Sequence, residues 1–177
     1  MKFIKMKFFD LLKLIREDYK RNNKNYKSIV VLFLFRIASF FQLSNKNLAL
    51  FILGIPFLIF YRIIIEWIFG IEIPAGCKIG GGLIIDHGQA LVINRNVIIG
   101  KNCRLRNSTT IGIKMGKDGN YNSPIIGDDV DIGANAIIIG DIRIGNNVIV
   151  GAGSVVTKNI PNNSVAVGNP AKVINKL

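Results

Sequence analysis

The sequence predicts a mainly β protein: a left-handed parallel β-helix over residues 70–177, preceded by a short α-helical segment over residues 1–69. Three observations lead to this prediction. The N-terminal segment spaces its apolar residues as helices do, the rest of the chain repeats an aliphatic residue every six positions, and Gly or Asn often follows the repeated residue. The fixed repeat outweighs other patterns, because a repeat decides the whole architecture.

The first segment contains three apolar stretches of helical character. The earliest, FFDLLKLIRE, repeats apolar residues at the spacing of one helix face. SIVVLFLFRIASFF and LALFILGIPFLIFYRIIIEWIF follow, separated by the polar QLSNKN. The uncharged run from Leu48 to Tyr61 has 14 residues and contains Pro56, whereas a membrane span needs about 20 apolar residues. We therefore expect helices that pack on a partner surface or lie on a membrane face, with a true span as the alternative.

The second segment repeats aliphatic side chains with a period of six. A six-residue unit forms one short strand and one corner, and three units complete a triangular coil. Each repeated side chain points inward and stacks on its equivalents in neighbouring coils, because one unit cannot bury its side chain alone. A β-sandwich would instead alternate with a period of two. The thirteen repeated positions are Ile73, Ile79, Ile85, Ile93, Ile99, Leu105, Ile111, Ile126, Ile132, Ile138, Ile144, Val150 and Val156.

The six-residue repeat also accounts for the glycines that follow the inward residues and for the two cysteines. Gly80, Gly100 and Gly127 are examples of the glycine that directly follows an inward residue. Because Gly and Asn tolerate left-handed backbone angles, we expect these residues to form the sharp corners. Cys77 and Cys103 fall at a second, small inward position, on different faces of the coil. This predicts buried core thiols rather than a disulfide or a metal site.

The charge of the chain is basic and unevenly spread. The net charge is +12, and residues 1–69 contain 12 Lys and Arg against 4 Asp and Glu. Basic charge beside apolar sequence favours an anionic membrane surface or an anionic ligand. Nucleic acid ranks lower as a partner, because no nucleic-acid-binding motif is present. The charged N-terminus lacks the apolar run and cleavage site of a signal peptide, which predicts a cytoplasmic protein.

Chemistry is expected where the repeat is interrupted, because a regular coil offers no reactive group. One interruption is a two-residue offset within IIDHGQALVI, which holds His87, the single histidine of the chain. The second is the polar stretch over 112–124, expected to project from the coil. The third is the C-terminal NIPNNSVAVGNPAKVI. Histidine exchanges a proton near neutral pH without help, so His87 is a candidate catalytic base, with a structural histidine as the alternative.

The chain resembles the hexapeptide-repeat acyltransferases from IEIPAGCKIGGGLIIDHG through IGANAIIIGDIRIGNNVIVGAGSVVTKNIP to AVGNPAKVI. Through Asp86-His87-Gly88 it is most similar to their serine O-acetyltransferase branch. The preceding LIFYRIIIEWIFGIEIP resembles the colanic acid and exopolysaccharide biosynthesis acetyltransferases of that branch. The resemblance covers about residues 61–174, and the repeats and the Asp-His-Gly motif carry most of it.

This resemblance implies a role for several residues. His87 matches the catalytic base, Glu72 matches an acidic position that orients the histidine, and Asp86 matches an acceptor-binding carboxylate. The residues implied to meet acetyl-CoA, the acetyl donor, are Gly112, Ala134 and Ala152 through the pantetheine arm, and Lys158 and Lys172 through the phosphates. A homotrimer is implied, with coenzyme A between neighbouring coils. The alternatives are a solvated strand residue for Glu72, a corner cap for Asp86 and plain solvation for the lysines.

Two departures bear on the acceptor. Serine acetyltransferases carry Arg-His-Pro at the end of the projecting loop, where this chain has Asn-Ser-Pro with Ser123. The resemblance also implies an acidic residue of the helical segment near the serine ammonium, whereas no Asp or Glu lies between Asp18 and Glu66. An amino-acid acceptor would therefore lack part of its ammonium partner. We therefore expect O-acetylation of a sugar in polysaccharide biosynthesis, with peripheral contact to a membrane or a lipid-linked glycan.

Three other functions remain open at this point. One is serine O-acetylation for cysteine biosynthesis. Another is a non-catalytic β-helix that acts only as a binding module. A metal-dependent coil enzyme would need several histidine ligands, so no metal is expected in a chain with one histidine.

Overall fold

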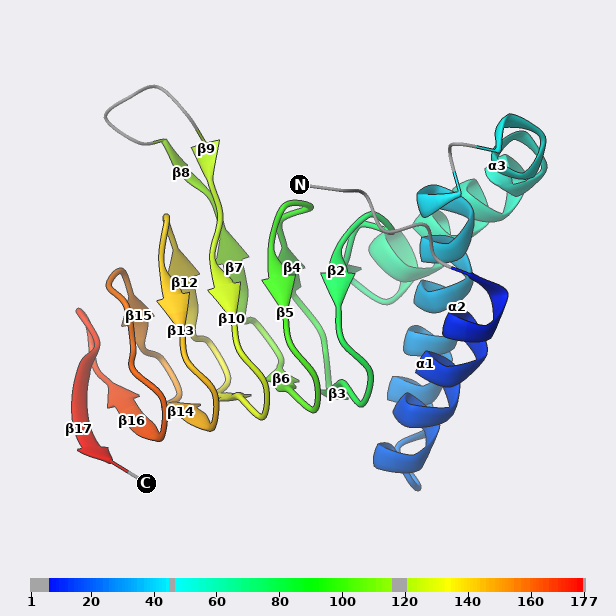
Figure 1. Ribbon diagram of the computed structural model, residues 1–177. Helices are drawn as coiled ribbons and strands as arrows, with labels where there is room; N and C mark the ends of the chain where they lie inside the picture. Colours follow the sequence, from blue (N-terminus) through cyan, green and yellow to red (C-terminus); the bar gives the residue numbers. More distant parts are fainter. Residues whose placement is uncertain (1–6, 45–46, 116–120, 177) are drawn as a thin grey trace.

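The structure, a computed structural model, describes residues 7–44, 47–115 and 121–176 (Figure 1). A helical layer precedes a long stack of short strands. The helices are α1 (Phe8–Arg21), α2 (Tyr26–Leu43), α3 (Leu48–Arg62) and the π-helical turn η1 (Ile63–Ile68). The coil begins directly afterwards, with β1 at Ile71.

The strands form three parallel faces of a left-handed β-helix, as predicted. Face 1 contains β1 (Ile71–Glu72), β4 (Leu91–Ile93), β7 (Thr110–Gly112), β12 (Ile137–Ile139) and β15 (Val155–Val156). Face 2 contains β2 (Lys78–Ile79), β5 (Ile98–Ile99), β10 (Ile125–Ile126) and β13 (Arg143–Ile144). Face 3 contains β3 (Ile84–Asp86), β6 (Arg104–Arg106), β11 (Asp131–Ile132), β14 (Val148–Val150) and β16 (Ser164–Val167), with the final strand β17 (Lys172–Lys176) antiparallel at its end.

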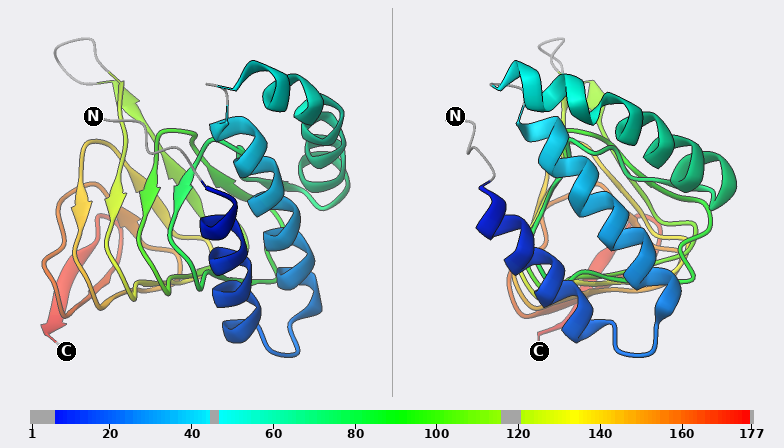
Figure 2. Two further views of the ribbon diagram at one scale, coloured as in Figure 1. Left: turned by 45° about the vertical axis from the view of Figure 1, so that its right-hand side comes forward. Right: turned by 90° about the vertical axis from the view of Figure 1, so that its right-hand side faces the viewer.

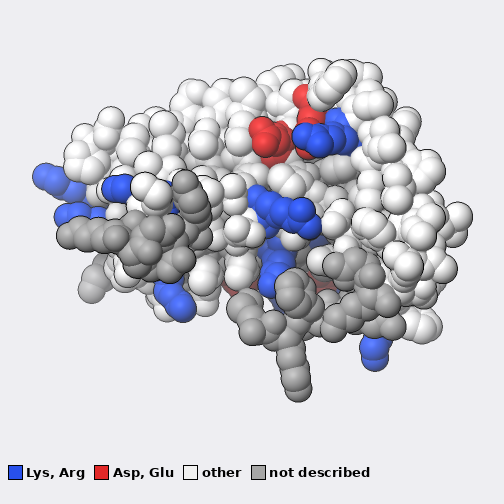
Figure 3. All heavy atoms as spheres, turned by 90° about the horizontal axis from the view of Figure 1, so that it is seen from above, with Lys and Arg blue, Asp and Glu red and all other residues white. Residues whose placement is uncertain are grey.

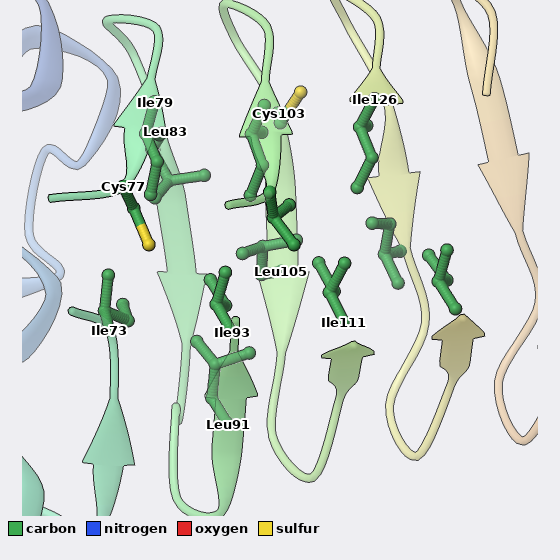
Figure 4. Close-up of a cluster of buried hydrophobic side chains, with 14 of the residues drawn as sticks. Ile73, Cys77, Ile79, Leu83, Leu91, Ile93, Cys103, Leu105, Ile111 and Ile126 are labelled. Carbon is green, nitrogen blue, oxygen red and sulfur yellow. The ribbon is translucent and has the colours of Figure 1, made fainter. Parts of the chain in front are cut away.

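The six-residue repeat builds the core. All thirteen repeated aliphatic side chains are buried. Figure 4 shows some of them, with Ile73, Ile93 and Ile111 in one row along the coil. On face 2, for example, Ile99 pairs with Ile79 on one side and with Ile126 on the other. Burial of aliphatic side chains is the dominant stabilising term in such a stack.

The interruptions appear as coils of unequal length. Ile138 pairs with Val156, eighteen residues further on. Ile71 instead pairs with Leu91, twenty residues on, so the two extra residues lie in the first coil, between β3 and β4. The largest insertion follows β7, where β8 (Lys114–Met115) and β9 (Tyr121–Asn122) pair antiparallel and project from the coil (Figure 1). Residues 116–120 of the predicted loop lie outside the described residues.

The prediction about the corner glycines is wrong. Gly100 and Gly127 do not adopt positive φ; the left-handed residues lie two positions later, for example Asn102 (φ 58°) and Asp129 (φ 57°). At these corners, which follow face 2, glycine is needed for a different reason. A Cβ on Gly100 would lie 2.4 Å from the carbonyl oxygen of Gly127 in the next coil, so the close approach of successive backbones excludes a side chain.

The two cysteines are core thiols, as predicted. Both are free and buried, Cys77 before face 2 and Cys103 before face 3. The Cys103 Sγ donates to the carbonyl of Gly127 at 3.2 Å. Burial raises the pKa of Cys77 to about 12 and that of Cys103 to about 11, which keeps both thiols protonated at neutral pH.

The three helices lie as one layer across the open end of the coil (Figure 2). Their apolar inner side, including Val31, Leu32 and Phe35 of α2, joins the core of the coil. The surface on which the helices pack is therefore the first coil of the same chain. By length and composition, Tyr26–Leu43 and Leu48–Ile68 are each sufficient to cross a membrane, but core helices of soluble proteins often have the same length and composition.

At this end of the β-helix, polar side chains of the helices supply the hydrogen bonds that a further coil would otherwise make with the first coil. Arg36 is buried and donates to both carboxylate oxygens of Asp18, at 2.7 and 3.2 Å. The same guanidinium donates to the carbonyls of Ile79 and Gly80 at 2.6 Å. The Asp18 carboxylate also accepts from the amide of Gly82 at 2.8 Å. Backbone groups that would otherwise be buried without partners are thus satisfied.

Candidate active site

His87 lies at a corner between face 3 and face 1 that is longer than its equivalents. Asp86 is in register with Arg106, and Val92 with Thr110, so three residues, 87–89, stand where the next coil has one. His87 (φ 66°), Gly88 (φ 73°) and Ala90 (φ 55°) all adopt left-handed angles. Other corners turn through a single left-handed residue, for example Asn102 or Asp129, so the three left-handed angles distinguish this corner.

The N-terminus of α2 holds this corner from the helical side. Lys27 Nζ donates to the carbonyl oxygen of His87 at 2.7 Å and lies 5.7 Å from the centre of the Phe69 ring. With its amide oriented to satisfy both polar atoms, Gln89 donates to the same carbonyl at 2.7 Å and accepts from Lys27 at 2.9 Å. Ser28 Oγ accepts from the Ile85 amide at 3.0 Å. The backbone of His87 is therefore fixed while its side chain stays exposed.

The imidazole makes no hydrogen bond within the described part of the chain, so both ring nitrogens are accessible to a substrate. Glu72, the predicted orienting residue, lies on the outer side of β1 and is exposed. No hydrogen bond joins Glu72 to His87 among the residues that the structure describes. The orienting role of Glu72 stays a prediction.

Glu72 lines a cleft of about 470 Å³ between α3 and the first coil. Arg62 and Arg95 line the same cleft, and Arg62 Nε donates to Glu66 at 2.8 Å. The pKa of Arg62 is raised, chiefly by its hydrogen bond to Glu66 and further by the charge of Glu72. Figure 3 shows acidic and basic side chains gathered near the helical end of the coil. The cleft therefore offers both signs of charge to a polar ligand.

Asp86 stands in a line of charged groups on face 3. Its carboxylate lies 3.5 Å from Arg104 Nε in the next coil. Arg106, beside it, forms an ion pair with Asp131 one coil further. This pair raises the pKa of Arg106, to which Asp86 also contributes by its charge. Asp86 thus has a nearby cationic partner before any acceptor binds, and its acceptor-binding role stays a prediction.

The predicted coenzyme A residues fall into two places. Ala134 and Ala152 occupy the same corner column in successive coils, in line with residues 87–89, and the Gly153 amide donates to the Ala134 carbonyl at 2.8 Å. Since coils are spaced by about 4.8 Å, the structure places them two and three coils from His87, roughly 10 and 14 Å along one edge. Their small side chains leave this edge open.

The other three predicted residues flank face 1. Gly112 is half-buried at the end of β7, where the projecting hairpin begins. Lys172 is exposed at the start of β17 and pairs with Val167. Lys158 is exposed at the other edge of face 1, after β15. The structure does not bring Lys158 to the edge shared by Ala134 and Ala152. Coenzyme A contact by these residues stays a prediction.

Sequence reasoning missed Lys27 and Gln89, because contact between the helices and a coil corner has no local signal. It also missed the arginines beside Asp86. The sequence could have predicted these arginines, because in Arg104-Leu105-Arg106 the inward Leu105 places both arginine side chains on the outer surface of the coil. Among the described residues, no three His, Cys, Asp or Glu side chains are grouped to hold a metal ion.

Comparison with known proteins agrees with this architecture. The family described as bacterial transferase hexapeptide (six repeats) matches residues 123–158. A protein of Escherichia coli (strain K12), WcaB, named for acetyl transfer in colanic acid biosynthesis, is 43% identical over 158 residues, which cover 89% of this chain and 96% of that protein. A serine acetyltransferase of Synechococcus elongatus is 40% identical over 105 residues, covering 59% of this chain and 43% of that enzyme.

Solved structures give the same result for the fold. Serine acetyltransferase from Neisseria gonorrhoeae superimposes with a TM-score of 0.77 at 29% identity, over 96% of this chain and 68% of that enzyme. Soybean serine acetyltransferase gives a TM-score of 0.75 at 31% identity, over 93% and 69%. The similarity to WcaB extends over the helices as well as the coil, whereas the Synechococcus match covers little more than half of the chain.

Proposed function

Because this chain is an acetyltransferase of the bacterial hexapeptide-repeat family, we propose that it transfers the acetyl group of acetyl-CoA to a sugar hydroxyl in the synthesis of a surface polysaccharide. The observation that carries the proposal is the corner at His87. Its backbone is held in a left-handed conformation by Lys27 and Gln89, and its imidazole is free to meet a substrate. A sugar hydroxyl is a weak nucleophile, and a positioned base accelerates its reaction by about 10²–10⁴-fold.

The reaction then has a simple course at this corner. The neutral His87 imidazole takes the proton of the acceptor hydroxyl as the oxygen attacks the thioester carbonyl carbon. The tetrahedral intermediate collapses, the carbon–sulfur bond breaks, and the sulfur leaves with the proton from the imidazolium. The products are an O-acetyl ester and free coenzyme A. A carboxylate near the imidazolium, from Glu72 or Asp86, would stabilise its charge.

The open edge of small residues suits the donor. The pantetheine arm would run along the column of Ala134 and Ala152 toward His87, with its amides meeting backbone groups at these corners. Gly112 lies at the other border of face 1, as Lys158 does, and would meet a donor bound along the edge of a neighbouring subunit. Lys158 and Lys172 lie at the two borders of face 1 toward the C-terminal end, where the phosphates would be. Because Lys158 and Lys172 lie at different borders of face 1, one chain would not bring both to the same donor. In a homotrimer, a groove between the β-helices of two subunits would bring Lys158 of one subunit and Lys172 of the other to the same coenzyme A.

A sugar is favoured over serine by two features. Ser123 donates its hydroxyl to the carbonyl of Asn96 at 2.9 Å, at the position that matches the histidine of Arg-His-Pro in serine acetyltransferases. Asp18, the last acidic residue before Glu66, is buried in its ion pair with Arg36. The Asp18 carboxylate is therefore not available to a serine ammonium, and a neutral hydroxyl acceptor needs no such partner.

The test is release of free coenzyme A thiol from acetyl-CoA by the purified protein, with UDP- and GDP-sugars, lipid-linked glycans and L-serine offered separately. We expect release with a glycan acceptor, none with L-serine, and loss of release in His87→Ala. Serine-dependent release that His87→Ala abolishes would instead establish the serine acetyltransferase alternative. If acetyl-CoA gives no protection against thermal unfolding, the chain is a binding module and the proposal fails.

We also propose that the protein works at the cytoplasmic face of the cell membrane, where lipid-linked glycan precursors are assembled. The basic and apolar helical layer at the end of the coil supports this location.

A further inference from the structure

The outer side of α3 and η1 is apolar along most of its length. Its exposed side chains form one ridge, which consists of Leu48, Ile52, Leu53, Ile55, Ile59, Phe60, Ile63, Trp67 and Ile68. Trp67 is 80% exposed. No charged residue occurs between Leu48 and Tyr61. An exposed apolar surface of this extent marks a binding face in a folded protein.

We propose that this ridge inserts, lying in the plane of the bilayer, into an anionic membrane surface. This inference rests on the proposed function, because insertion of the ridge would bring the enzyme to an acceptor that is bound to the membrane. The helical layer would face the lipid and the coil would extend away from it. In the proposed trimer the coils lie side by side, so three ridges would face the same membrane and add to one another's binding.

Tertiary contacts decide that the helix lies in the membrane plane rather than crosses it. One side of α3 and η1 is attached to the protein along its length. A Cβ on Gly54 would lie 2.4 Å from the Phe41 ring, so α3 and α2 are in close contact. Tyr61 donates its hydroxyl to the Ile73 carbonyl at 2.6 Å, and Ile65 is fully buried in the core. A crossing would have to break these contacts.

Charge and composition favour lipid over a second copy of the chain. The cores of protein interfaces are ringed by polar side chains, whereas this ridge has Arg62 and Glu66 only near its end, bonded to each other. Helix α1, which packs against α2, adds an apolar groove to the same helical layer, lined by Leu12, Tyr19 and Phe33. The exposed cations Lys13, Arg16 and Lys20 lie on α1. Cations beside apolar side chains are the pattern of a helix that binds anionic lipid.

Trp67 supplies the measurement, because it is the single tryptophan of the chain. Vesicles of phosphatidylglycerol and phosphatidylcholine in equal parts should shift its emission to the blue. Lipids brominated in the acyl chains should quench it. Vesicles of phosphatidylcholine alone should bind at least tenfold more weakly. Changing Lys13, Arg16 and Lys20 together to Gln should reduce binding to the anionic vesicles by about tenfold or more.

A pair of variants tests the ridge itself. Ile52→Glu with Ile59→Glu places two charges on the ridge and should reduce vesicle binding at least tenfold. The control Ile174→Glu adds one such charge at the opposite end of the coil, where the exposed fraction of Ile174 is 56%, against 55% at Ile52. The control should bind as the unchanged protein does. Protection by acetyl-CoA against thermal unfolding should persist in all variants, which shows that they are folded.

Several outcomes would overturn the inference. One is a protein that acetyl-CoA protects but that binds neither kind of vesicle. Another is vesicle binding unchanged by the two glutamates. A third is the combination of two results. Light scattering gives a smaller particle mass for the double variant than for the unchanged protein, and brominated lipids do not quench Trp67 in the unchanged protein. The ridge would then join copies of the chain. Vesicle binding without thiol release for any acceptor would instead count against the proposed function alone.

Discussion

The corner after β3 and the corner after β6 are equivalent places in successive coils, yet they are built differently. The later one turns through Asn107 with one left-handed residue, Ser108, and pairs with coils on both sides. The earlier one has three residues in the place of Asn107 and three left-handed angles, and α2 holds it on its outer side. The comparison suggests how a corner of the coil becomes a candidate active site: extra backbone residues are inserted there, and a helix outside the coil holds them in place.

The largest effect should come from removing the support of the first coil. Arg36→Met would leave the Asp18 carboxylate buried without its partner, which costs about 3–5 kcal/mol in the free energy of unfolding. Urea unfolding measures this change. The control Arg62→Met breaks an exposed pair and should change stability little. Equal stability of Arg36→Met and the parent would show that the helices are not held by this ion pair.

Removing the histidine should separate activity from stability. His87→Gly should lower kcat/KM by about 10²–10⁴-fold, because the base is lost. Its melting temperature should not fall, because glycine accepts the left-handed angle at no steric cost. Thiol release and a thermal melt of the same sample measure both. Lys101→Ala, an exposed change at another corner, is the control and should keep full activity. Retained activity in His87→Gly would exclude His87 as the base.

Shortening the first corner tests whether its geometry matters as well as its histidine. Deleting Gly88 and Gln89 restores an eighteen-residue coil and keeps His87 at the place of Asn107. The coil should still fold, while kcat/KM falls about 100-fold, because small displacements of a catalytic group have effects of this size. Circular dichroism and thiol release check the two parts. Full activity of the deleted form would mean that the extra backbone serves no catalytic purpose.

A smaller effect is expected at Lys27. Lys27→Met removes the donor to the His87 carbonyl and should lower kcat about tenfold, with KM for acetyl-CoA unchanged. Lys27→Arg keeps a cationic donor and should restore most of kcat. Lys24→Met, close by on the loop before α2, should have no effect. If KM rises instead while kcat stays constant, Lys27 acts on binding of the donor rather than on the position of His87.

The smallest effect concerns the two thiols. Because burial raises the pKa of Cys77 to about 12 and that of Cys103 to about 11, both stay protonated well above neutral pH, and the thiolate is the reactive form. At pH 8 the folded protein should react with a thiol reagent only slowly, and both cysteines should react after unfolding. Rapid labelling of Cys77 but not of Cys103 would show that the first coil opens more readily than the second.

The sequence carried the fold and one part of the site. The period of six placed every inward side chain, because burial in a stack of identical units depends on that spacing alone. The offset around His87 was visible for the same reason, since a repeat makes its own interruptions visible. The glycines that follow inward residues do lie at corners, but the predicted reason, left-handed backbone angles, was wrong. The actual reason is the short distance between the backbones of successive coils, which the sequence of one repeat unit does not contain.

What the sequence by itself determined is therefore the coil, its core and the place of its single histidine. Only the tertiary structure decided that α2 holds the His87 carbonyl through Lys27, that Arg36 and Asp18 close the end of the coil, and that α3 keeps an apolar side exposed. The reason is range. The repeat is local and is read along the chain, whereas these contacts join residues 18 to 64 positions apart, and packing alone brings them together.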